Sequence, residues 1–154
     1  MENFTMDVDQ KVVRFTGVIF TFVGLYFAVC LFIPLQFDKN PFVWFKSEYF
    51  TQFIPFYIAV TLLLSGLFLT TRFFQANIYL AVFGHTASEE ILFSWIGITN
   101  TDLPLSAIVV FFPLSLLALW LGYFNILKQR KLSLLEGVCG FVGSTALLLL
   151  PRFI

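Results

Sequence analysis

The apolar residues of this chain gather in four long runs, at positions 15–37, 49–71, 103–127 and 132–151. The first three runs contain no charged residue, and the fourth contains one, Glu136. An α-helix rises about 1.5 Å per residue, so each run is long enough to cross the roughly 30 Å hydrocarbon core of a bilayer. The pattern predicts an all-α, polytopic bundle of transmembrane helices.

The segment between the second and third runs leaves the number of spans at four or five. Positions 73–84 and 91–98 are mostly apolar, but the polar stretch 85–90 lies between them. As one helix from 73 to about 95 the segment is long enough to span, although it then places His85, Glu89 and Glu90 in or near the membrane. As a solvated loop, the same stretch would open a short helix with Thr86 and Glu89 as a capping box.

The basic residues distinguish the two arrangements, because short cytoplasmic loops collect Lys and Arg. With four spans the nine basic residues divide 4 to 5 between the two sides. With five spans they divide 6 to 3. The smaller group is Lys39, Lys46 and Arg152, and the larger group on the other side is Lys11, Arg14, Arg72, Lys128, Arg130 and Lys131. The five-span arrangement with a cytoplasmic N-terminus is the better charge solution.

Composition supports one membrane domain over residues 1–154. Hydrophobic residues make up 59% of the chain and charged residues 12%, against about 25% charged in a soluble domain, so lipid is the expected outer solvent. Nine acidic residues balance nine basic ones, which argues against a nucleic-acid partner. Cys30 and Cys139 fall inside apolar runs, where a thiol packs as a small hydrophobe.

Small residues recur at helical spacing on one face of three runs, where backbones can approach closely. Packing within the bundle is the first interpretation of these stripes, and docking on another subunit is the alternative. The stripes contain Gly17, Thr21, Gly24 and Ala28; Ser115, Ala118 and Gly122; and Gly137, Gly140 and Ser144.

Candidate chemistry is confined to two places. His85 and Glu89 are four residues apart, with Glu90 adjacent, and such groups in a membrane mark proton relays, ion paths or metal ligands. Glu136, at the start of the last run, is interpreted as a helix N-terminal acid beside Arg130 or Lys131, with a buried functional carboxylate as the alternative. Neither place completes a metal site, and no cofactor is expected.

The chain has a single histidine and no nucleophile elbow or phosphate-binding loop, so an enzyme is not expected. Its 22 phenylalanines suit an outer surface that faces lipid or a larger membrane partner. The first functional hypothesis is a non-enzymatic accessory or structural subunit that packs against another integral membrane protein or a second copy. The alternative is a small proton- or ion-coupled transporter or channel-like protein that uses His85, Glu89 and Glu90.

Overall fold

The computed structural model describes residues 2–35, 38–40, 42, 46–99, 103–126 and 130–153, with side chains described from residue 10 onward. Five α-helices make up most of this part of the chain, and it contains no strand. In chain order they are α1 (Glu2–Phe32), α2 (Ser47–Thr71), α3 (Ala76–Trp95), α4 (Leu105–Tyr123) and α5 (Leu134–Leu149), and a short 3₁₀ helix, η2 (Leu150–Arg152), follows α5.

Four of these helices are long and apolar enough to cross a membrane: α1, α2, α4 and α5. Their apolar stretches are 23, 24, 19 and 19 residues long, and the last one continues from α5 through η2 to Arg152. Each has a mean hydropathy of at least 1.7. The predicted fold class, an all-α polytopic membrane bundle, is therefore confirmed. The remaining helix, α3, has 20 residues and so about 30 Å of length, but it contains His85, Glu89 and Glu90 and is not among these four.

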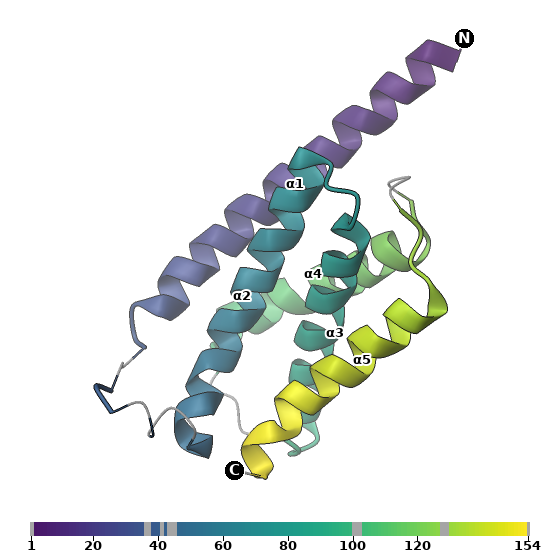
Figure 1. Ribbon diagram of the computed structural model, residues 1–154. Coiled ribbons are helices and arrows are strands. Elements are labelled where there is room, and N and C mark those ends of the chain that lie inside the picture. Colours follow the sequence, from purple (N-terminus) through teal and green to yellow (C-terminus); the bar gives the residue numbers. More distant parts are fainter. Residues whose placement is uncertain are drawn as a thin grey trace.

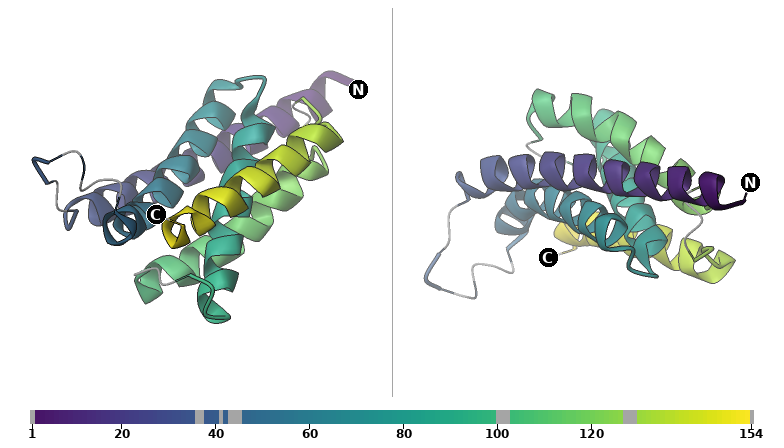
Figure 2. Two further views of the ribbon diagram at one scale, coloured as in Figure 1. Left: turned by 60° about the horizontal axis from the view of Figure 1, so that its bottom comes forward. Right: turned by 90° about the horizontal axis from the view of Figure 1, so that it is seen from above.

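The helices alternate in direction, so that the two ends of the chain lie at opposite ends of the bundle (Figure 1). α3 lies in the middle: α2 and α5 flank it and α4 crosses behind it (Figures 1 and 2). α1 packs along α2, touches α3 through the rings of Phe20 and Phe83, and projects beyond the bundle at its N-terminal end (Figure 1). The helix that carries His85, Glu89 and Glu90 is therefore the one that the others surround.

The solvated-loop interpretation of 85–90 is wrong. These positions lie in the second half of α3, and Glu89 and Glu90 are buried. Thr86 does not cap a helix start, because its hydroxyl donates to the Val82 carbonyl one turn earlier at 2.8 Å. The packing of α3 against its neighbours stabilises the helix more than the local preference of residues 85–90 for a polar loop opposes it.

Glycines bring α1 and α2 into backbone contact. A Cβ at Gly66 of α2 would meet the backbone nitrogen of Thr21 and lie 2.7 Å from the carbonyl oxygen of Gly17. A Cβ at Gly24 would likewise meet the backbone of Leu63. The stripe that includes Gly17, Thr21 and Gly24 thus lies at the α1–α2 interface, with buried Ala28 further along the same helix.

Helix α5 begins with a complete capping box. The Ser133 hydroxyl accepts a hydrogen bond from the Glu136 backbone N–H, and the Glu136 carboxylate accepts one from the Ser133 N–H at 2.9 Å. The same carboxylate accepts a 2.7 Å charge-assisted bond from Arg130. Glu136 is partly exposed, so the alternative of a buried carboxylate at this position is corrected: the cap holds the side chain at the helix end.

Candidate functional site: a polar centre around helix α3

The polar side chains of α3 are enclosed by apolar helices. Together with their hydrogen-bond partners they form the polar centre of the bundle. Glu89 is 5% exposed and Glu90 0% exposed, and Asn77, Thr86 and Ser88 are buried on the same helix. A carboxylate cannot be solvated by hydrocarbon, so it needs hydrogen-bond donors from the protein. The donors come from three different parts of the chain.

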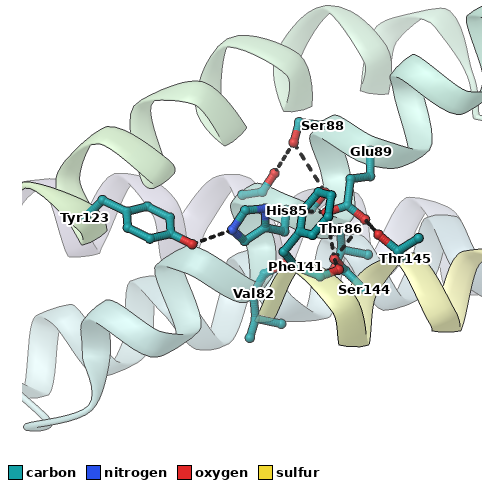
Figure 3. A network of polar contacts seen from close by, with 10 residues as sticks. Val82, His85, Thr86, Ser88, Glu89, Tyr123, Phe141, Ser144 and Thr145 are labelled. Atoms are coloured by element: carbon teal, nitrogen blue, oxygen red, sulfur yellow. Dashed lines mark hydrogen bonds and ion pairs between the residues drawn. The ribbon is translucent and has the colours of Figure 1, made fainter. Parts of the chain in front are cut away.

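Two hydroxyls of α5 point at Glu89 (Figure 3). The Ser144 hydroxyl lies 2.9 Å from each carboxylate oxygen, and Thr145 Oγ1 donates to Oε2 at 2.8 Å. Ser144 and Thr145 are consecutive residues, so α5 presents both to the carboxylate from one turn. The buried carboxyl group of Glu89 therefore has a short donor set that links α3 to α5.

His85 lies one turn before Glu89 and joins it to α4. Its Nδ1 is 3.4 Å from Glu89 Oε1, and its Nε2 is 2.7 Å from the hydroxyl of Tyr123, at the end of α4. The rings of Tyr123 and Phe141 pack edge-on against the imidazole and fix its plane. The result is a continuous polar chain from Tyr123 through His85 and Glu89 to Ser144 and Thr145 (Figure 3).

This chain runs from the surface into the bundle. Tyr123 is exposed, His85 is half-buried and Glu89 is buried. The hydroxyl and the imidazole can both give and accept a hydrogen bond, and the imidazole nitrogens face different partners. The three side chains therefore place groups that can donate and accept hydrogen bonds in sequence from Tyr123 to Glu89.

Glu90 faces a different neighbour. Its Oε1 accepts a 2.8 Å hydrogen bond from Thr99, which follows α3 in sequence. Gly97 has φ of +74° and makes this contact possible, since it turns the chain back with bonds from Ile98 N to Phe93 O and from Gly97 N to Ser94 O. This is the usual glycine-terminated helix end, and it returns Thr99 to the side of α3.

The remaining small residues lie around α3. Ser115, Ala118 and Gly122 are buried on α4, and a Cβ at Gly122 would lie 3.2 Å from the Asn77 carbonyl oxygen of α3. On α5, a Cβ at Gly137 would lie 2.9 Å from the Tyr123 ring, and one at Gly140 would lie 3.8 Å from His85. The absence of side chains at Gly137 and Gly140 gives α5 room beside the Tyr123–His85 pair.

The sequence pointed to His85, Glu89, Glu90 and Ser144, the last only as a packing residue. It missed Tyr123, Thr145 and Thr99, although the adjacent pair Ser144 and Thr145 inside the last apolar run was a usable signal. Within the part of the chain that the structure describes, no three His, Cys, Asp or Glu side chains gather into a group that could hold a metal ion.

The chain matches no protein-family model, no curated protein and no solved structure. Its function is therefore argued from its own residues.

Proposed function

We propose that this protein is a small proton-translocating membrane protein in which Glu89 is the central proton acceptor. The observation that carries the proposal is the buried Glu89 carboxylate, tied by His85 to the exposed Tyr123. A charge at the centre of a membrane costs roughly 2.5–3.5 kcal/mol, and apolar residues of similar size stabilise a bundle as well or better. Retaining a carboxyl and an imidazole at this depth is explained by proton exchange.

The two nitrogens of His85 provide the transfer step. Tyr123 gives its hydroxyl proton to Nε2 and takes one from a hydronium ion, which becomes water, while Nδ1 gives its proton to the Glu89 carboxylate. The imidazole stays neutral in its other tautomer, and Glu89 becomes a neutral acid. Reversing the tautomer returns the relay to its starting state.

A proton fits the site better than a metal cation. Ser144 and Thr145 occupy the carboxylate oxygens of Glu89 with hydroxyl donors, which would have to turn away before a cation could bind. A proton needs only one of those oxygens. The hydroxyls then continue to hold the neutral acid in place.

The experiment uses the purified protein in liposomes that contain a pH-sensitive dye, with protons driven inward by a potassium diffusion potential. Protein-containing liposomes should acidify faster than empty ones, and Glu89→Gln should abolish the difference while its melting profile in detergent is kept. Glu136→Gln is the matched control, because Glu136 is a capping residue outside the polar centre, and it should retain full flux. Equal flux from Glu89→Gln and the unmodified protein, or from liposomes with and without protein, would overturn the proposal.

A second candidate function is an accessory subunit that binds another integral membrane protein through α1. The observation in its favour is the outer face of α1, where Phe15, Phe22 and Tyr26 are exposed and which α2 leaves uncovered. Large aromatic side chains on a projecting helix are suited to a protein partner as well as to lipid.

A photo-crosslinking amino acid at position 22 tests the second candidate in intact membranes. Under this function it should yield one discrete crosslinked protein, whereas the same probe at position 109 of α4, where Val109 is comparably exposed, should not. Labelling of lipid alone at both positions would exclude a stable partner on α1.

We also propose that all five helices cross the membrane and that the N-terminus is cytoplasmic. The basic residues support this orientation, because in the five-span arrangement they divide 6 to 3 along the sequence in favour of the side of the N-terminus.

A further inference from the structure

A pocket of about 70 Å³ is lined by residues at the start of α2, after α3 and in η2. These segments lie at the end of the bundle opposite the C-terminal end of α4, the helix that ends at Tyr123 (Figure 1). The polar lining of the pocket is formed by Ser47 and Thr51 at the start of α2, Thr99 after α3, and Arg152 in η2. The buried side chains of Ile54 and Leu148 also line it. A single water needs roughly 10–15 Å³ of such space, so the pocket has room for several.

Thr99 belongs both to this pocket and to the polar centre. It lines the pocket and its hydroxyl donates to Glu90 at 2.8 Å. Arg152 fixes the turn that carries Thr99, because its guanidinium donates to the Gly97 carbonyl at 3.1 Å. One hydroxyl therefore separates the pocket from a carboxyl that is itself 0% exposed.

We infer that this pocket is a hydrated entrance through which Glu90 exchanges protons with the water at the C-terminal end of the bundle. A hydronium ion in the pocket gives a proton to Thr99 and becomes water, and Thr99 gives its own hydroxyl proton to Glu90, so the hydroxyl is unchanged after the step. Glu89 and Glu90 are consecutive on α3 but have separate donors, Ser144 and Thr145 for one and Thr99 for the other. The two carboxyls are thus reached from opposite ends of the protein.

The inference rests on the proposed function, but its test does not need flux. The background is the chain with Cys30 and Cys139 replaced by alanine, since both are free and exposed. A single cysteine is then placed at Leu148, which lines the pocket, or at Ile91, which does not; both side chains are 1% exposed. A methanethiosulfonate reacts with the thiolate, which forms in water and not in hydrocarbon.

Methyl methanethiosulfonate should modify Leu148→Cys and leave Ile91→Cys unmodified, although both are equally buried. Thr99→Cys should react as well. A charged, impermeant methanethiosulfonate should modify Thr51→Cys only from the side on which the C-terminus lies. Unreactive Leu148→Cys and Thr99→Cys in folded protein would overturn the hydrated pocket, and modification of Ile91→Cys at the same rate would do so too.

A carbodiimide provides the second measurement, on Glu90 itself. The protonated carboxyl adds across a C=N bond, its proton passes to nitrogen, and the O-acylisourea rearranges to a stable N-acylurea that mass spectrometry locates. A water-soluble carbodiimide should label Glu90. Prior modification of Thr51→Cys with the charged methanethiosulfonate should reduce that labelling severalfold and leave the labelling of Glu89 unchanged. Unchanged labelling of Glu90 after the block would show that the pocket is not its route, whatever the flux assay gives.

Discussion

At the scale of single residues, Glu89 depends on hydroxyls that the rest of the bundle cannot replace. Ser144 and Thr145 are its donors from α5, and His85 is its neighbour on α3. Removing both hydroxyls leaves Oε2 of Glu89 buried without its two donors, and the cost of that loss exceeds the net value of the bonds. The polar centre therefore contributes to stability through these few contacts.

Replacing Ser144 with Ala and Thr145 with Val should lower the free energy of unfolding by about 1–3 kcal/mol, because Glu89 loses its α5 donors. Chemical unfolding in mixed micelles, followed by helicity, measures the change. Thr71→Val is the matched control, since Thr71 is exposed and its hydroxyl donates to carbonyls of its own helix. In a Glu89→Leu background the double substitution should cost little, and an undiminished cost there would show that Glu89 is not the reason.

The sequence identified His85, Glu89 and Glu90 and missed most of their partners, because residue type shows the first group and not the second. A His or Glu inside an apolar segment is conspicuous wherever its partners lie. Tyr123, Thr145 and Thr99 carry residue types that occur in any membrane helix or loop. Their roles depend on separations of 38 residues from His85 to Tyr123 and 56 from Glu89 to Thr145, which only the fold determines.

At the scale of helices, length and hydropathy predicted α1, α2, α4 and α5, because a helix that faces lipid must be apolar on its outer side. The same measure left α3 ambiguous, because its neighbours cover it and its polar residues need never meet lipid. The beginning of α1 also differs from the prediction. The apolar run starts at Phe15, whereas the helix starts at Glu2, since hydropathy marks the membrane boundary and not the helix boundary.

The α1–α2 pair rests on backbone contact at Gly66. Gly66→Ala should destabilise the protein by about 1–3 kcal/mol, as expected for overpacking, because the new methyl meets the backbone at Thr21 and Gly17. The loss should appear as a lower unfolding midpoint in micelles. Gly143→Ala, also within a helix, provides the control: its Cβ would meet nothing within 4 Å, and its midpoint should not fall. Equal midpoints for the two variants would mean that α1 does not pack tightly on α2.

At the scale of the whole molecule, the order of the helices sets the topology. Five helices that alternate in direction place the two ends of the chain at opposite ends of the bundle (Figure 1). The polar centre then lies between an exposed Tyr123 near one end and the Thr99 pocket near the other. A proton path across the membrane requires that α3 cross it, because Glu89 and Glu90 both belong to α3.

Reporters fused to the two ends of this chain test that requirement directly. If α3 crosses, a fluorescent reporter active only in the cytoplasm should report at the N-terminus, and one active only outside should report at the C-terminus. A third reporter placed after residue 99 should share the side of the C-terminal one, because α4 and α5 return the chain to that side. The basic residues allow a separate prediction about orientation. Removing three of them, by Lys11→Gln, Arg14→Gln and Arg72→Gln, should weaken the orientation and populate the inverted form, because half of the larger group is lost. Both termini on one side would leave α3 within one half of the membrane, and neither Glu89 nor Glu90 could then connect the two aqueous compartments.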